Sequence, residues 1–171
     1  NGYEDLELHY PRIRLMEAKY GVDLIGLSED VITGKHGYPV KPDLSINNAN
    51  PDDYVGLIVP GGASNPDHLR RYDSVLEFVR KIDEKKKLVG AICHAGWVLI
   101  SAKILTGKAA TSYFAIKDDM INAGVLFKDK AVVIDDNLIT SRTPDDLPEF
   151  MKAIIEYLDK VEKIHVLGED T

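Results

Sequence analysis

Residues 88–96 read Leu88-Val89-Gly90-Ala91-Ile92-Cys93-His94-Ala95-Gly96. The apolar run before the cysteine is typical of a buried parallel strand, and the largely apolar stretch that follows, to about residue 102, indicates a helix. A strand that turns sharply into a helix needs small residues two positions before and after the turn, because larger side chains would collide. Ala91 and Ala95 meet that need. The pattern predicts a tight turn that lifts Cys93 above the sheet.

Cys93 is the only cysteine in the chain, which excludes an intrachain disulfide framework and a multi-cysteine zinc site. A thiol at a helix N-terminus lies near free N–H groups and the positive end of the dipole, so we expect its pKa below the usual ~8.5. Such a thiolate attacks carbonyl carbon well. The alternative is a buried cysteine that packs as a small hydrophobic side chain. The flanking alanines and the adjacent His94 favour the functional reading.

Strands and helices alternate along the rest of the chain. Patterns of strands occupy residues 22–27, 55–59, 125–136 and 138–140, with a small hairpin at 31–33 and 38–40, and residues 111–113 close a further short strand. Helical periods occupy 6–20, 73–86, 116–123 and 144–160. We expect Thr143 to cap the last helix, with Pro144 at its first position and Asp146 completing a capping box. This order predicts an α/β sandwich on a mostly parallel sheet, with ligands at the carboxyl ends of the strands.

The composition describes one domain over residues 1–171, with 44% hydrophobic and 29% charged residues. A formal charge of −7 with scattered basic residues makes nucleic acid a poor partner. No run is long and apolar enough for a membrane span, so we expect a cytoplasmic protein without a membrane partner. The five histidines lack metal-ligand spacing, and no dinucleotide or phosphate glycine pattern occurs, so neither a metal nor a cofactor is expected.

Several motifs together resemble the ThiJ/PfpI family, most strongly its PfpI branch of intracellular cysteine proteases, also described as protein deglycases. The resemblance rests on residues 2–5 (Gly-Tyr-Glu-Asp), 33–38 (Thr-Gly-Lys-His-Gly-Tyr), 60–62 (Pro-Gly-Gly), 91–94 (Ala-Ile-Cys-His), 111–113 (Thr-Ser-Tyr), 117–119 (Lys-Asp-Asp) and 141–147 (Ser-Arg-Thr-Pro-Asp-Asp-Leu). It spans nearly the whole chain in order. It implies a three-layer, flavodoxin-like fold of the class I glutamine-amidotransferase type.

The resemblance also implies roles for individual residues. Cys93 would be the nucleophile, and Glu4 the acid whose protonated carboxyl hydrogen-bonds the sulfur. The backbone N–H groups of Gly62 and His94 would form an oxyanion hole, a site that stabilises charge on the attacked carbonyl oxygen. Gly61 and Tyr113 would line the substrate pocket. Each residue also has a simpler reading: a helix first-turn acid for Glu4, a turn for the glycines and packing for the tyrosine.

In the protease branch a glutamate from a neighbouring subunit orients the histidine, and Asp67 takes roughly that place here. Its side chain is shorter, and the loop at residues 63–66 is one residue longer than the family pattern. The resemblance further implies a homo-oligomer, a dimer or a hexamer. Ala95 stands where the family usually has glycine, which narrows the pocket without removing the turn.

Family members begin with a central strand that leads directly into the Glu4 loop, and this chain begins three residues before Glu4. Residues 163–171, followed head to tail by residues 1–5, resemble that beginning. We therefore expect residues 164–167 to form a strand in the central first-strand position, through circular permutation or through exchange with another copy. The simpler alternative is an extra edge strand or tail.

Two classes of function remain open on the sequence. The first is a cysteine-dependent hydrolase that acts at carbonyl carbon, with peptide bonds, glycated adducts or 2-oxoaldehydes as substrates. The second is a non-catalytic redox sensor or stress chaperone whose Cys93 is oxidised. Sequence does not choose between peptide and small carbonyl substrates.

Overall fold

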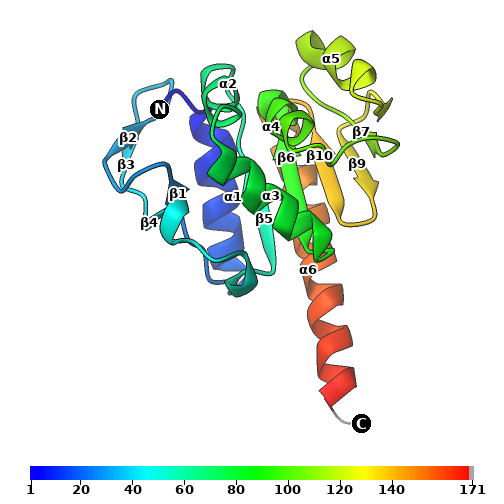
Figure 1. Cartoon of the computed structure of the whole chain (residues 1–171). Coiled ribbons are helices and arrows are strands. Elements are labelled where there is room, and N and C mark those ends of the chain that lie inside the picture. The colour runs from blue at the N-terminus through cyan, green and yellow to red at the C-terminus, as the bar shows by residue number, and fades with distance from the viewer. Residues whose placement is uncertain (170–171) are drawn as a thin grey trace.

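The computed structural model describes residues 1–169, with side chains through Lys163. A four-stranded sheet lies at its centre, in the order β5-β6-β10-β9 (Figure 1). These strands are β5 (Gly56–Val59), β6 (Leu88–Ile92), β10 (Leu138–Ser141) and β9 (Val132–Asp135). The first three are mutually parallel, and β9 is antiparallel to β10. The mostly parallel sheet expected from the sequence is confirmed.

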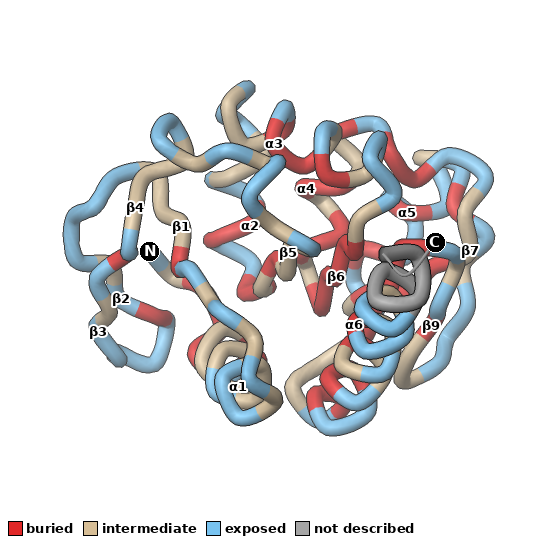
Figure 2. The backbone as a smooth tube through the Cα atoms, turned by 90° about the horizontal axis from the view of Figure 1, so that it is seen from below, coloured by how far each residue is buried: buried red, intermediate tan, exposed pale blue. Residues whose placement is uncertain are grey.

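Helices cover both faces of this sheet. On one face lie α1 (Asp5–Glu17) and α6 (Leu147–Glu169), and on the other lie α2 (Ser64–Leu69), α3 (Asp73–Glu84) and α4 (Gly96–Ser101) (Figure 2). A further short helix, α5 (Lys117–Asn122), packs beside α4. The three-layer α/β sandwich is therefore confirmed. The helices α1 and α3 lie close to their predicted ranges, whereas α6 continues past its predicted end at residue 160 to Glu169.

Short strand pairs flank the main sheet. They are β1 (Ile25–Gly26) parallel to β4 (Leu44–Ser45), β2 (Ile32–Thr33) antiparallel to β3 (Pro39–Val40), and β7 (Ala109–Ala110) parallel to β8 (Leu126–Phe127). The predicted hairpin corresponds to β2 and β3. The short strand that residues 111–113 are expected to close corresponds to β7, in which pairing ends at Ala110. The chain then turns toward Cys93, whose carbonyl accepts the Tyr113 N–H at 3.1 Å.

The prediction of a strand at residues 164–167 is wrong, because the backbone there continues α6, which ends at Glu169. Within the described residues, β5 and β1 are edge strands, and a groove of about 730 Å³ lies between them. Apolar side chains such as Ile25, Leu57 and Ile58 contribute to its walls. The four-stranded sheet and the β1–β4 pair therefore remain separate from each other across this groove.

The core is centred on β6, in which every residue is buried. Val89 and Ala91 face the cluster beneath α3 and α4, whereas Leu88 and Ile92 face the cluster beneath α6. This alternation follows from the two-residue period of a strand. Gly90 lets α6 approach closely, because a Cβ there would lie 3.3 Å from the Phe150 ring.

The start of the last helix differs from its predicted cap. Thr143 makes no side-chain capping bond, and Pro144 opens a short 3₁₀ turn before α6. Asp146 instead accepts hydrogen bonds from the backbone and guanidinium of Arg142, at 3.1 Å and 2.9 Å. A buried carboxylate is better satisfied by this charged partner than by the neutral Thr143 N–H.

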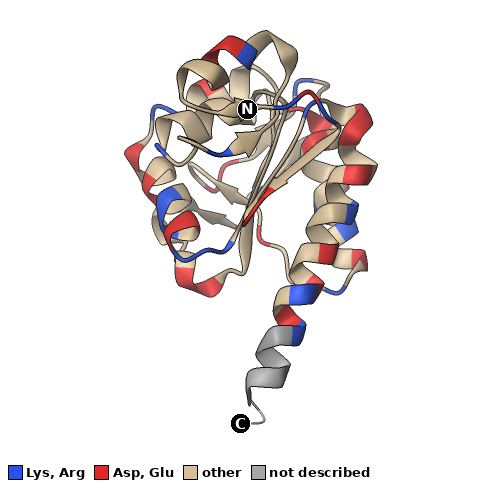
Figure 3. Ribbon diagram, turned by 90° about the vertical axis from the view of Figure 1, so that its right-hand side faces the viewer, with Lys and Arg blue, Asp and Glu red and all other residues tan. Residues whose placement is uncertain are grey.

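The outer surface carries charges of both signs along the same helices (Figure 3). Among residues 1–169, no helix combines the length and the apolar character that crossing a bilayer requires. The two signs are interspersed over the face that the figure shows.

Phe150 offers a test of this packing, because its side chain is fully buried against the strand that carries Cys93. We expect Phe150→Ala to lower the free energy of unfolding by about 3–5 kcal/mol through lost burial and a residual cavity. Urea unfolding measures the change, with Lys152→Ala on the exposed side of α6 as the control. A loss below about 1 kcal/mol for Phe150→Ala would contradict this packing.

Candidate active site

Cys93 lies at the end of β6 in the predicted tight turn. Its φ of 62° lies in the left-handed region, which a non-glycine residue rarely adopts, and a 3₁₀ turn at Cys93–Ala95 leads into α4. Ala91 and Ala95 are both buried on either side. The strained backbone and its small neighbours confirm the turn that the sequence indicates.

Two glycines bring a second loop against this turn. A Cβ on Gly61 would lie 2.7 Å from the Cys93 Cβ and 2.8 Å from the Ile92 carbonyl oxygen, so only glycine fits there. Gly62 adopts a φ of 80° beside the backbone of residues 2–4. The loop after β5 therefore contacts the cysteine through its backbone.

Glu7, and not Glu4, is the acid that meets the sulfur. Its fully buried carboxyl accepts the Gly61 N–H at 2.7 Å and hydrogen-bonds with Cys93. Burial is the main cause that raises the pKa of Glu7 from 4.5 to about 7, and the nearby Glu4 charge adds to it, whereas the Gly61 N–H opposes it. Near neutral pH this carboxyl is thus protonated in a large fraction of molecules.

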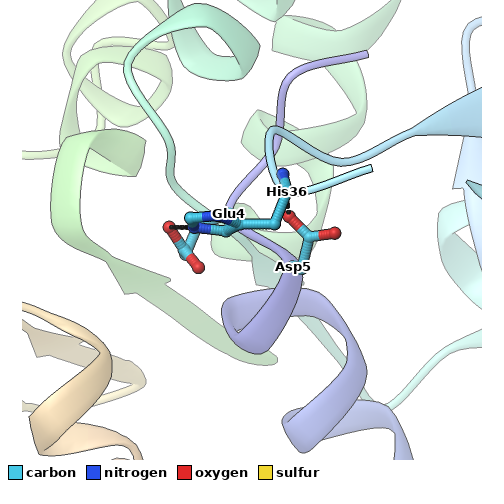
Figure 4. Close-up of side chains that lie close together, drawn as sticks. All are labelled: Glu4, Asp5 and His36. Carbon is cyan, nitrogen blue, oxygen red and sulfur yellow. Dashed lines mark hydrogen bonds and ion pairs between the residues drawn. The ribbon is translucent and has the colours of Figure 1, made fainter. Parts of the chain in front are cut away.

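The prediction that the Glu4 carboxyl hydrogen-bonds to the sulfur is wrong. Glu4 occupies the N-cap position of α1, before the turn of helix that carries Glu7. Its carboxylate contacts Lys35 Nζ at 2.5 Å and His36 Nε2 at 3.5 Å. Figure 4 shows the His36 ring beside Glu4, with Asp5 next to them (Figure 4). Helical spacing in the sequence could have identified Glu7 as the buried acid, because Glu7 follows Glu4 by one turn and lies on the buried side of α1.

Oxygen and nitrogen atoms of Glu4, Asp5 and His36 lie within 4.8 Å of one another. Asp5 accepts the backbone N–H groups of His36 and Tyr38, at 2.9 Å and 3.2 Å. The Lys35 ammonium already contacts Glu4. The cluster therefore anchors the β2–β3 hairpin, with Asp5 bonded to backbone N–H groups and Glu4 paired with the Lys35 ammonium.

The Cys93 thiol does not have the lowered pKa expected from its position. Burial is the main cause that raises its pKa to about 12, and the Glu7 charge adds to the rise. The backbone N–H groups of Gly62 and His94 both hydrogen-bond to this cysteine and oppose that rise. The expected helix-end donors are therefore present, but burial and the neighbouring acid outweigh them, and the resting sulfur is a thiol.

His94 folds back onto its neighbour. Its Nδ1 lies 3.2 Å from the Cys93 sulfur, and its ring stacks on Tyr113 with 4.7 Å between centroids and meets Trp97 edge-on at 5.2 Å. Burial, and secondly the Lys35 charge, lower the pKa of His94, so the ring is neutral near pH 7. A neutral imidazole beside a thiol can accept its proton.

Within the chain, Asp67 does not reach His94. It lies on α2, where its exposed carboxylate pairs with Arg71. Tyr113, in contrast, lies at the site as expected, packed on His94. The structure thus brings together Cys93, His94, the two glycines and Tyr113, adds Glu7, and leaves Asp67 and Glu4 in other contacts.

Residues 1–157 match the DJ-1/PfpI family. The chain belongs to the DJ-1/PfpI family. Among members of the DJ-1/PfpI family, Deglycase PfpI of Pyrococcus furiosus is 44% identical over 158 residues, which cover 92% of this chain and 95% of that protein. A relative from Bacillus subtilis, YraA, carries a cysteine-protease name and is 44% identical over 157 residues, covering 91% of this chain and 92% of its own.

Solved structures of the DJ-1/PfpI family superpose closely. The DJ-1/ThiJ/PfpI-like part of a two-domain protein from Anabaena variabilis gives a TM-score of 0.91 at 38% identity, over 93% of this chain and 46% of that one. Drosophila melanogaster DJ-1beta gives 0.88 at 29% identity, over 99% and 91% of the two chains. The flavodoxin-like fold of the family is therefore confirmed for this chain.

The raised pKa of Glu7 predicts a specific pH dependence of stability. The folded protein holds the Glu7 proton that the unfolded chain releases, so this contribution is complete below about pH 4.5 and is lost as pH rises through about 7. We expect Glu7→Gln, which keeps the acceptor for Gly61 and has no charge, to be more stable than the parent at pH 8 by about 3 kcal/mol.

Urea unfolding of both proteins from pH 4 to pH 8 measures this difference, which should shrink toward zero at the acidic end. Glu149→Gln on the exposed side of α6 controls for loss of one acidic residue. A difference between Glu7→Gln and the parent that stays constant across this range would contradict the assignment.

Proposed function

We propose that the chain is a cysteine-dependent hydrolase of the PfpI type, acting at carbonyl carbon. One observation carries the proposal: the His94 Nδ1, the Glu7 carboxyl and two backbone N–H groups all converge on the sulfur of Cys93. A cysteine that only fills space needs none of these partners. The names of the relatives, deglycase and cysteine protease, support the same chemistry.

In the first step the Cys93 sulfur attacks the carbonyl carbon. A sulfur–carbon bond forms, the carbonyl π electrons move to oxygen, and His94 Nδ1 takes the thiol proton as the bond forms. This route suits a thiol with a raised pKa, because a neighbouring base removes the proton during attack. In this proposal the N–H groups of Gly62 and His94, which hydrogen-bond to Cys93 at rest, stabilise the developing oxyanion.

The second step depends on the substrate. With a peptide, the tetrahedral intermediate expels the amine, which takes the proton from His94, and water then hydrolyses the thioester. With a 2-oxoaldehyde, free or released from a glycated adduct, the alkoxide takes the proton back from His94 and the first product is a hemithioacetal. Transfer of its hydrogen to the adjacent carbonyl carbon then gives a 2-hydroxy thioester, which water hydrolyses. The protonated Glu7 carboxyl remains beside the sulfur throughout and donates a hydrogen bond to it when it carries negative charge.

The alternative, a redox sensor or stress chaperone, receives less support. Oxidation by peroxide requires the thiolate, and the raised pKa of Cys93 leaves little of it near pH 7. The hydrolase needs only a base within reach, which His94 supplies. The catalytic reading therefore fits this protonation state better.

Replacement of the nucleophile tests this function. We expect Cys93→Ala to lose at least about 1000-fold in kcat/KM, because no other cysteine can form the intermediate. Initial rates with methylglyoxal and with a fluorogenic peptide measure this loss and separate the two substrate classes. Lys152→Gln, on the exposed side of α6, should keep the parent rate. Turnover by Cys93→Ala at the parent rate would end the nucleophile assignment.

A cytoplasmic homo-oligomer, a dimer or a hexamer, is also part of this proposal, with Asp67 of one copy contacting His94 of another. Asp67 lies on α2, and its side chain is 52% exposed to solvent. This exposure supports such a contact. His94 makes its one side-chain hydrogen bond in the described structure through Nδ1, to Cys93, which leaves Nε2 for a carboxylate.

We expect Asp67→Asn to lower kcat by about 10-fold or more, and Asp67→Glu to retain activity, because orientation of a histidine depends on a carboxylate acceptor. Initial rates on both variants, with Asp118→Asn as the control, measure the effect, and sedimentation velocity gives the oligomeric state. A strictly monomeric enzyme with full activity would contradict the intersubunit role.

A further inference from the structure

Lys35 lies on the β2–β3 hairpin, which is fastened beside the candidate site. Its backbone N–H donates to the Tyr3 carbonyl at 2.9 Å, and the Gly2 N–H donates to the Thr33 carbonyl at 2.9 Å. These bonds hold the hairpin against the segment that leads into α1. The position of the lysine is therefore set by backbone contacts.

A short series of contacts connects Lys35 with the cysteine. Its ammonium lies 2.5 Å from Glu4 Oε2, and the Glu4 N–H donates to the Gly61 carbonyl at 3.2 Å. Gly61 in turn lies directly against Cys93. The lysine side chain is 49% exposed, whereas that of Glu4 is 6% exposed. The ammonium thus lies at the solvent side of the site and rests on a buried carboxylate.

An ammonium has three donors, and the structure assigns one of them to Glu4. Among the described residues, His94 and Arg70 do not supply a comparable cation. His94 is neutral near pH 7, and Arg70 donates to Ser101 while its guanidinium lies 5.6 Å from the Trp97 ring centroid. The charge of Lys35 acts on Cys93, Glu7 and His94 alike.

We propose that Lys35 is a specificity-determining residue that binds a substrate carboxylate, so that the Cys93 site prefers carbonyl compounds with a carboxylate close to the reactive carbon. This inference rests on the proposed hydrolase function, because Lys35 would bind a substrate of that reaction. Two sources share this chemistry: a 2-oxoaldehyde that carries a carboxylate, such as mesoxalic semialdehyde, and the C-terminal carboxylate of a short peptide. Glu4 holds the ammonium in place and partly offsets its charge.

Alkylation of Cys93 tests the proposal without turnover. Iodoacetate and iodoacetamide react by the same step, in which a sulfur–carbon bond forms, iodide leaves and the thiol proton passes to His94 Nδ1, but only iodoacetate is an anion. The readout is the ratio of their rate constants, followed by intact mass. We expect Lys35→Gln to lower the iodoacetate-to-iodoacetamide ratio by about three- to ten-fold, and Lys35→Arg to preserve it.

Glu4→Gln should raise the iodoacetate-to-iodoacetamide ratio, because it removes the carboxylate that competes for the ammonium. Lys152→Gln, which removes an equal charge from the exposed side of α6, is the matched control and should leave the ratio unchanged. The proposal is overturned if Lys35→Gln keeps the parent ratio, or if Lys152→Gln lowers it equally.

Turnover then separates the two sources of the carboxylate. Mesoxalic semialdehyde is compared with methylglyoxal, and a peptide with a free C-terminus is compared with its amide. A rise in KM for Lys35→Gln with only the charged member of one pair identifies that source, and equal rises with charged and neutral members overturn the specificity role. If the alkylation ratio falls but the parent protein turns over none of these compounds, the hydrolase proposal fails while the anion-binding role of Lys35 stands.

Discussion

The buried contact between the Glu7 carboxyl and the Cys93 thiol governs the chemistry of this site. Both groups are acids in a place that disfavours charge, so they resist ionising together. The carboxyl has a pKa of about 7, and the thiol stays protonated until a base takes its proton. His94, neutral and 3.2 Å away, is the group in position to do so.

The fold supplies this contact by bringing three backbone segments to one point. The end of β6 places Cys93 in a left-handed turn, and Gly61 allows the loop after β5 to touch it. The first turn of α1 directs Glu7 inward to the same loop. Packing of the core against the sheet positions each segment. This packing offsets the energetic cost of the strained backbone at Cys93.

Much of this arrangement could be predicted from local patterns. The apolar run at Leu88–Ile92 and the small residues around Cys93 fixed the strand and the turn. Choosing Glu7 over Glu4 required knowing where α1 begins, since one turn of helix decides which carboxyl faces inward. The raised thiol pKa depends on burial and on a neighbouring acid, which lie far from Cys93 in the sequence. Residues 164–167 have a strand-like composition, but the backbone continues α6 there.

The ultraviolet absorbance of the thiolate, followed as pH rises in the parent protein and in Glu7→Gln, tests the central claim most directly. Because Cys93 is the only cysteine, the signal has one source once the tyrosine contribution is subtracted with Cys93→Ala. We expect the parent thiol to stay protonated well above neutral pH and the thiol of Glu7→Gln to ionise at lower pH. A parent thiolate already formed at pH 7, or identical titrations of the two proteins, would contradict it.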